Sequence, residues 1–330
     1  MKFMPNAAKA EKNCVSENAP THTTPSVSGF SLAVAANVLW GTSFLASKYT
    51  LLFWGPLTAS ALRFAVALIT MIIFFPKFGF KIEFPKSKSD WSHVFAVGVT
   101  GFGALYPLQL SGMKYVSSAL SAAIMLTSPL LLVLLGPIFL GERLSSRKLL
   151  ALGLGIAGGI FLISNGGSLS RLVNESRDIL LGGGLTLAAS LSLALSVVLT
   201  RKASKKISAP TLTFWSMLIG LILIAPFSVF ETHVPQVATQ GQSSFYLAIF
   251  SLLYLAVICS ALCFLIWNRA ISRATPKELA STMHLKTPVA ILLGTVVAGE
   301  AFRISQIFGA LIVAAGVYLS QTERKDKARV

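Results

Sequence analysis

The sequence contains one long apolar unit twice, and this internal repeat constrains the fold more than any other feature of the chain. The first copy covers residues 117–164 and the second covers 276–320, each with an apolar run, a central proline, a turn and a second apolar run. Pro288 follows Pro129 by 159 residues. Further upstream, residues of the first copy still match similar residues of the second, such as Gln109 with Asn268 at an offset of 159 and Pro56 with Pro210 at an offset of 154. The chain is therefore interpreted as two copies of one unit.

Each unit contains five apolar segments, and this odd number predicts how the two copies are oriented. The ten segments are expected near residues 30–52, 57–76, 92–113, 117–140, 147–164, 179–200, 211–230, 245–268, 277–298 and 304–321. Most reach the ~20 residues that a helix needs to cross a hydrocarbon core, where the backbone must satisfy its own hydrogen bonds. The second unit then enters from the opposite face. We predict an all-α integral membrane protein with ten transmembrane helices as two inverted five-helix repeats.

The composition and the distribution of charge agree with a membrane protein. Hydrophobic residues make up 54% of the 330 residues and charged residues only 12%, whereas soluble domains carry about 25% charged residues. The net charge of +16 does not indicate nucleic-acid binding, because the basic residues are scattered between apolar runs. Of the 28 Lys and Arg residues, 21 fall on the side of the N-terminus and five on the other. The positive-inside rule then predicts a multi-pass protein of the cell membrane with both termini cytoplasmic.

The domain organisation follows from the segments and the polar stretches between them. It comprises a disordered cytoplasmic tail at 1–29, the first repeat at 30–164, an external linker at 165–178, the second repeat at 179–321 and a basic cytoplasmic tail at 322–330. The first tail is polar and lacks the apolar stretch of a secretory signal. Short connections leave no room for an inserted soluble domain.

Lys286 is the most informative single residue for function. It lies nine residues after Lys277 and thirteen before Gly299, which places it near the centre of the bilayer. A charge at that depth costs ~2.5–3.5 kcal/mol and should face protein or water. Its counterpart in the first repeat is Thr127, so the repeat itself does not require the charge. We expect Lys286 to bind an anionic group or to couple an ion. The alternative is a structural lysine that is neutralised by burial or paired to a carbonyl freed by proline.

The two central prolines are expected to kink their helices. Pro288 removes the hydrogen bond to the carbonyl of His284, and Pro129 does the same for Met125. Carbonyls freed at this depth can serve as polar contacts in a cavity, although a simple kink explains the prolines equally well. His284 itself is a candidate for substrate contact or proton relay, and a buried neutral histidine is the alternative.

Several motifs in this order resemble the EamA-like family of the drug/metabolite transporter superfamily. The Trp40-Gly41-Thr42-Ser43-Phe44 run lies in the first apolar segment, Pro129 follows in the fourth, and Glu142 closes the turn after it. The second copy departs from the pattern, with Ala194-Leu195 in place of Trp-Gly. The resemblance covers roughly residues 30–321. It implies a ten-helix metabolite carrier driven by protons or another gradient, often an exporter, with a central cavity lined by helices 1, 3, 4, 6, 8 and 9.

Polar and aromatic residues on those helices become candidates for the cavity wall. They are Trp40, Phe44, Tyr106, Gln109, Trp267 and Asn268, beside Lys286 and His284. Arg63, at a position where members of the family often carry arginine, is expected to snorkel outward or to brace the first helix. Glu142 and Glu300 close the matched turns of the two repeats, and both are interpreted as structural.

The sequence argues against an enzyme. No nucleotide-binding loop, metal-ligand cluster or catalytic triad is present, so neither a metal nor another cofactor is expected. Cys259 and Cys263, four residues apart in one apolar segment, are expected to be packing residues.

These observations favour a secondary transporter that moves a small polar metabolite by alternating access. An amino acid or a related compound is the leading cargo from the family resemblance. A carrier of anionic or phosphorylated metabolites that uses Lys286 is the first alternative, and a non-transporting membrane scaffold or sensor subunit is the second. The expected partners are the substrate, protons or a counter-substrate, and the lipid bilayer. No nucleic acid is expected, and an oligomer is allowed but not required.

Overall fold

The computed structural model of the chain describes residues 28–140, 145–163, 177–232, 242–273, 279 and 282–322. These residues form helices, turns and short connections, and no strand occurs among them. Glu142 lies outside the described residues, as do nearly all of the two terminal tails and most of the expected 165–178 linker.

Helices lie over the apolar segments expected from the sequence. In the first repeat they are α1 (Gly29–Thr50), α2 (Pro56–Phe74), the short η1 (Pro76–Phe78), α3 (Lys88–Val97), η2 (Gly98–Ala104), α4 (Leu105–Gly112), α5 (Ser118–Met125), α6 (Ser128–Leu140) and α7 (Ser146–Ile163). In the second they are α9 (Arg177–Ala203), α10 (Ala209–Val229), α12 (Gln242–Leu253), η3 (Tyr254–Leu262), α13 (Cys263–Arg273), α15 (Lys286–Val296) and α16 (Ile304–Thr322).

Seven helical runs in the described residues are long and apolar enough to cross a membrane. They are Gly29–Thr50, Pro56–Phe74, Lys88–Gly112, Ser118–Leu135, Arg177–Ala203, Ala209–Val229 and Gln242–Ala270. The apolar stretches Lys286–Val296 and Ile304–Ser320 are shorter. An all-helical chain suited to a membrane is therefore confirmed, and the full count of ten spans in two inverted repeats stays a prediction.

Local sequence signals set several of the helix starts. Ser28 caps α1 by accepting a hydrogen bond from the Ser31 N–H, and Ser117 caps α5 in the same way from Leu120. Ser87 and Asp90 form a reciprocal capping box at the start of α3. These side chains satisfy N–H groups that a first helical turn leaves without partners.

Both central prolines lie where a helix is interrupted. The run expected at 117–140 divides into α5 and α6, and Leu126 and Thr127 make only turn-type bonds to Ala123 and Ile124 at 3.2 and 3.0 Å. In the second repeat a turn before α15 precedes Pro288. The carbonyl of His284 is not free as expected, since the N–H of Thr287 donates to it at 3.4 Å. The chain thus bends at matched points of the two repeats.

A second matched irregularity was not expected from the sequence. The third helical run of each repeat contains a π-helical stretch, η2 at Gly98–Ala104 and η3 at Tyr254–Leu262. Thr100 in η2 and Cys259 in η3 are 159 residues apart, the same offset that relates the prolines. Each of their carbonyls accepts a bond from a helix of the other repeat, from Ser192 at 2.9 Å and from Trp40 at 3.0 Å. Segments of this kind are frequent at functional sites.

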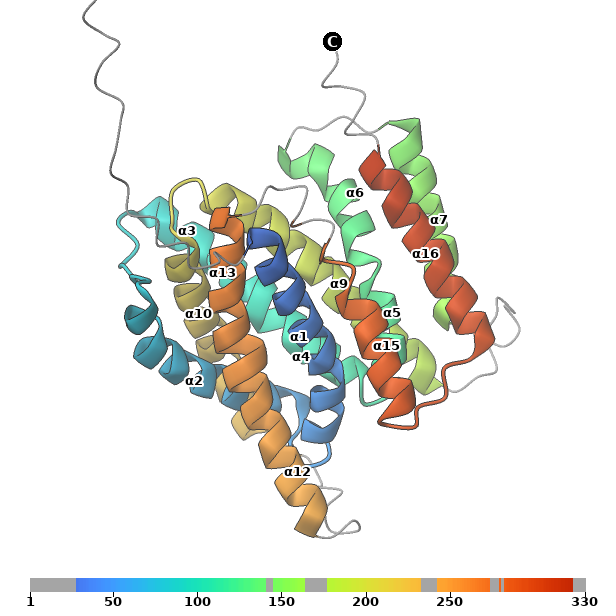
Figure 1. Ribbon diagram of the computed structural model, residues 1–330, viewed down its shortest axis with the longest axis horizontal. Helices are drawn as coiled ribbons and strands as arrows, with labels where there is room; N and C mark the ends of the chain where they lie inside the picture. The colour runs from blue at the N-terminus through green and yellow to red at the C-terminus, as the bar shows by residue number, and fades with distance from the viewer. Residues whose placement is uncertain are drawn as a thin grey trace, which may run out of the picture.

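The helices pack so that α1 runs through the middle of the molecule. It lies between α13 on one side and α15 on the other, whereas α7 and α16 lie side by side at one edge (Figure 1). Glycines allow α7 and α16 to approach each other closely. A Cβ on Gly158 would lie 2.9 Å from the Gly309 carbonyl oxygen.

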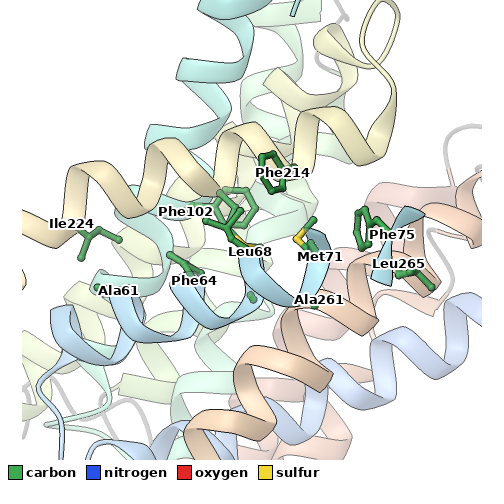
Figure 2. Packing of buried hydrophobic residues seen from close by; sticks show 12 residues of the cluster. Ala61, Phe64, Leu68, Met71, Phe75, Phe102, Phe214, Ile224, Ala261 and Leu265 are labelled. Carbon is green, nitrogen blue, oxygen red and sulfur yellow. The ribbon is translucent and has the colours of Figure 1, made fainter. Parts of the chain in front are cut away.

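The largest apolar cluster holds α2 against η2, α10 and the helix that contains η3. Figure 2 shows Phe64, Leu68 and Met71 of α2 directed toward Phe102 and Phe214 of neighbouring helices. Phe64 and Met71 are fully buried. Burial on this scale contributes roughly 1.5–3 kcal/mol for each large side chain, so α2 is firmly held beside the residues described next.

Candidate functional site

An aromatic and polar cluster joins the middle of α1 to the irregular helix of the second repeat. The Trp40 ring lies 5.4 Å from the Trp267 ring and 5.6 Å from the Phe264 ring, measured between centroids. Its indole N–H donates to the Cys259 carbonyl of η3. Two residues further along α1, the Thr42 hydroxyl and the hydroxyl of Tyr254 form a hydrogen bond of 2.7 Å. Two of the expected wall residues, Trp40 and Trp267, are therefore brought together.

The two cysteines of the same region contact α1 through their thiols. The Cys259 Sγ lies 3.4 Å from the Leu39 carbonyl oxygen, and the Cys263 Sγ lies 3.9 Å from the Ala36 carbonyl oxygen. Both side chains are buried. No group of three or more His, Cys, Asp or Glu residues suited to a metal ion occurs within the described ranges. The thiols therefore act here as packing groups along α1.

Arg63 lies inside the protein, not at its surface. It is 2% exposed and is the eighth residue of α2, about 10 Å from the start of the helix at 1.5 Å per residue. Its Nε donates to the Ser260 Oγ at 2.8 Å, and its guanidinium lies 4.6 Å from the centre of the Tyr106 ring. The expectation of outward snorkelling is wrong, because the side chain is buried and its contacts are with η3 and α4. A brace against α1 stays a prediction.

Ser260 is suited to receive this arginine because of the π-helical backbone. Its hydroxyl donates to the carbonyl of Leu255, five residues earlier, at 2.9 Å. The hydroxyl oxygen is thereby left to accept from the Arg63 Nε. Neither terminal nitrogen of Arg63 has a hydrogen bond or a carboxylate partner among the described residues. Part of a strong donor group therefore remains available for a ligand.

Lys286 begins α15 at the interruption before Pro288. It is half-buried, and its ammonium group has no hydrogen bond or acidic partner in the part of the chain that the structure describes. It lies one turn before Ala290, which is fully buried. A Cβ on Gly41 would lie 2.7 Å from the Lys286 carbonyl oxygen. The neighbour of Trp40 on α1 is thus in backbone contact with Lys286.

The remaining expected wall residues occupy different surroundings. Gln109 and Asn268 lie at matched positions of the repeats, on α4 and α13. Asn268 is 6% exposed, and its Nδ2 has no hydrogen-bond partner among the described residues. Phe44 is 5% exposed within an apolar cluster that also contains Ala290. His284 is half-buried in the turn before α15.

A carboxylate of the second repeat closes the face at which α1 ends. The Glu300 side chain accepts from the Ser118 N–H at 3.0 Å, the Ser118 hydroxyl at 2.8 Å and the Ala119 N–H at 3.0 Å. It also pairs with the Lys48 ammonium at 3.0 Å. Glu300 therefore caps α5 and neutralises the end of α1, and its partner is Lys48, not its sequence neighbour Arg303.

Glu231 makes a second contact of the same kind on this face. Its carboxylate accepts from the N–H of Leu57 at 3.1 Å and of Thr58 at 2.8 Å, at the start of α2. A Cβ on Gly55 would collide with this carboxylate. Glu231 and Glu300, here called the carboxylate clamp, both belong to the second repeat and both hold helix starts of the first. Sequence reasoning missed Glu231, since nothing near it in the chain marks its partners.

The physical cause of the Glu300 charge state is clear from its surroundings. Burial alone would raise the pKa of this carboxyl, but the bonds from Ala119 and Ser118 and the contact with Lys48 outweigh burial. The pKa of Glu300 therefore lies below the ordinary value of a glutamate. Glu300 is therefore ionised at neutral pH.

Comparison with known proteins gives a consistent result. The model of the EamA-like transporter family matches the chain twice, over residues 27–164 and 180–322. An "uncharacterized transporter" of Archaeoglobus fulgidus is 26% identical over 288 residues, which cover 87% of this chain and 95% of that protein. A protein of Escherichia coli, named "probable amino-acid metabolite efflux pump", is 26% identical over 296 residues, covering 88% of this chain and 93% of its own.

A protein of known crystal structure has the same fold. It superposes with a TM-score of 0.61 at 18% sequence identity, and the match covers 89% of this chain and 98% of that chain. The two comparisons by sequence and the one by structure therefore extend over nearly the whole described region.

Proposed function

The chain belongs to the EamA-like transporter family, and from that premise we propose that it is a secondary transporter that moves a small polar metabolite, an amino acid or a related compound, by alternating access. The Escherichia coli relative, by its name an amino-acid metabolite efflux pump, supports this class of cargo. The two prolines at helix interruptions and the half-buried Lys286 at one of them support a site between the repeats.

Lys286 carries the proposal because it offers a charge at a broken helix without a partner from the described residues. Discontinuous helices at the midplane are where secondary carriers bind their substrates. The backbone contact with Gly41 places the lysine next to α1 and its tryptophan. We expect the Lys286 ammonium to hold a carboxylate of the cargo.

The first prediction is that Lys286→Met lowers substrate flux strongly, while Lys286→Arg retains part of it. Methionine keeps the length but removes the charge, and a hydrogen bond to a charged group contributes about 1.5–3 kcal/mol. The loss of apparent affinity should then be roughly 10- to 100-fold. The measurement is metabolite-resolved flux in proteoliposomes, with and without an imposed proton gradient.

Lys114→Met is the matched control, because Lys114 is an exposed lysine at the end of α4. It should behave like the wild type. A correctly inserted Lys286→Met protein with unchanged affinity, exchange and pH dependence would leave the lysine a structural role. The absence of flux for every small metabolite, with the protein folded, would instead support a scaffold.

The second prediction concerns orientation. We propose that both termini and the 77–90 and 201–206 loops face the cytoplasm, because 21 of the 28 basic residues fall on that side. Lys86 is 83% exposed in its side chain, so Lys86→Cys in a protein without native cysteines tests this directly. An impermeant maleimide should label it only after the cells are opened. Labelling from outside intact cells would reverse the proposed orientation.

A further inference from the structure

Two cations lie deep within the apolar segments of the sequence, and no acidic residue lies at a comparable depth. Arg63 and Lys286 are the two basic residues deep within the apolar segments, at positions 7 and 10 within 57–76 and 277–298. Of the twelve acidic residues, only Glu278 falls inside any of the ten apolar segments, and it is the second residue of its segment. The chain therefore provides no carboxylate at the depth of either cation, and their charge must be balanced by something else.

A short path of contacts leads from Arg63 to the turn of α1 that touches Lys286. Arg63 donates to Ser260, whose neighbour Cys259 accepts the indole bond of Trp40 at 3.0 Å. The next residue of α1, Gly41, packs on the backbone of Lys286. Both cations are thus linked to one turn of α1, Arg63 indirectly through η3 and Trp40, and Lys286 through its backbone contact with Gly41.

Each cation is arranged to bind a ligand. The Nε of Arg63 is held by Ser260, and the guanidinium carbon lies 4.6 Å from the centre of the Tyr106 ring. Neither terminal nitrogen has a partner in the described ranges. A guanidinium held in this way retains the fork that binds a carboxylate with two parallel bonds. Lys286, by contrast, offers a flexible point charge from the start of α15.

We propose that Arg63 and Lys286 form one anion-binding site and that the cargo is a small metabolite with two acidic groups. This inference rests on the proposed transport function and names its class of substrate. A diacid balances both cations. A neutral zwitterion leaves one cation unbalanced and adds its own ammonium group to the same region. The aromatic faces of Trp40 and Trp267 would then pack against the carbon skeleton between the two acids.

Isosteric pairs of ligands test the inference on the purified full chain. Glutamate is compared with glutamine, and succinate with succinamate, because each pair differs only in whether the second acid is an amide. The readouts are the shift of the melting midpoint in detergent and the uptake into proteoliposomes. At least one diacid should bind about tenfold or more tightly than its amide partner. Equal binding within both pairs, or no effect of either diacid, overturns the inference.

Two variants separate binding by Arg63 from a structural role. Arg63→Gln should abolish the preference for the diacid, and Arg63→Lys should restore only part of it. Ser260→Ala removes the same bond between α2 and η3 but leaves the guanidinium in place. If Arg63 binds cargo, Ser260→Ala retains the preference; if it only braces η3, the two changes have equal effects and the inference fails.

The outcome is distinguishable from a failure of transport itself. Selective flux of a monoacid such as glutamine would keep the proposed function and refute the diacid site. No flux of any small metabolite, together with normal folding, would refute the proposed function. Lys114→Met remains the control for a change of lysine that leaves the site intact.

Discussion

Glu300→Gln should lower the melting midpoint of the protein and open the face at which α1 ends. The glutamate accepts three bonds at the start of α5 and pairs with Lys48, whose side chain is 36% exposed. A glutamine can accept with one oxygen only, and its amide N–H groups oppose those of Ser118 and Ala119. Hydrogen bonds to charged groups contribute about 1.5–3 kcal/mol, and the exposed lysine adds little. A loss of about 2–3 kcal/mol is expected.

The same change should be visible as a shift between two conformations. The proposed alternating access would require this face to open, and the clamp joins the second repeat to the starts of α2 and α5 in the first. Removal of one clamp residue should raise the rate at which an impermeant maleimide labels Gln109→Cys by about tenfold. A tenfold rise corresponds to a change of ~1.4 kcal/mol in the equilibrium between the closed and the open conformation. Glu83→Gln is the control, because the Glu83 side chain is 60% exposed and its ion pair with Lys86, at 3.9 Å, is long and solvent-exposed.

The pH dependence of the clamp follows from the lowered pKa of Glu300. A carboxyl whose folded pKa lies below its unfolded value stabilises the fold fully above the unfolded value, about 4.3, and loses this stabilisation as the pH falls through the folded value. Acidification from pH 7 to about 5 should therefore leave the contacts of Glu300 intact. The labelling rate of Gln109→Cys is measured over this pH range with Glu300 present and with Glu300→Gln. A rate that rises only when Glu300 is present would contradict the lowered pKa of Glu300.

The apolar runs predicted the helices well because bilayer-spanning helices depend on local composition. The run expected at 30–52 is α1 at Gly29–Thr50, and the run at 211–230 is α10 at Ala209–Val229. The π-helical stretches η2 and η3 were missed. An extra residue in a helical turn changes hydrogen bonding but not hydrophobicity, so an apolar sequence does not reveal it.

The contacts of the candidate site could be predicted less well, because they join residues far apart in sequence. Arg63 and Ser260 are separated by 197 positions, and Ser118 and Glu300 by 182. Sequence reasoning identified both charged residues and assigned them structural roles, without naming either partner. A buried arginine still allows a snorkelling or a bracing geometry until the opposing helix is known. The repeat placed Lys286 at depth but gave no neighbour across α1.

Gly41→Ala should reduce transport severely, because α1 and α15 touch at this glycine. The new Cβ would lie 2.7 Å from both the Lys286 carbonyl oxygen and the Val289 Cβ. Backbone atoms cannot move aside as a flexible side chain can, so the two helices must separate. Overpacking of this kind costs about 1–3 kcal/mol, and Gly41→Val should cost more.

The loss of transport from Gly41→Ala should exceed the loss of stability. The helix that must move is α15, which begins with Lys286, and the residue before Gly41 in α1 is Trp40. The Trp40-Gly41 pair thus gains a physical meaning: the tryptophan holds η3 on one side, and the absence of a side chain at Gly41 admits α15 on the other. Gly153→Ala in α7 is the control, because no atom of the described residues lies within 4 Å of its new Cβ and alanine favours a helix over glycine by about 1 kcal/mol. Flux and melting midpoint are measured for each variant. Wild-type values of both for Gly41→Ala would show that α15 does not approach α1 this closely.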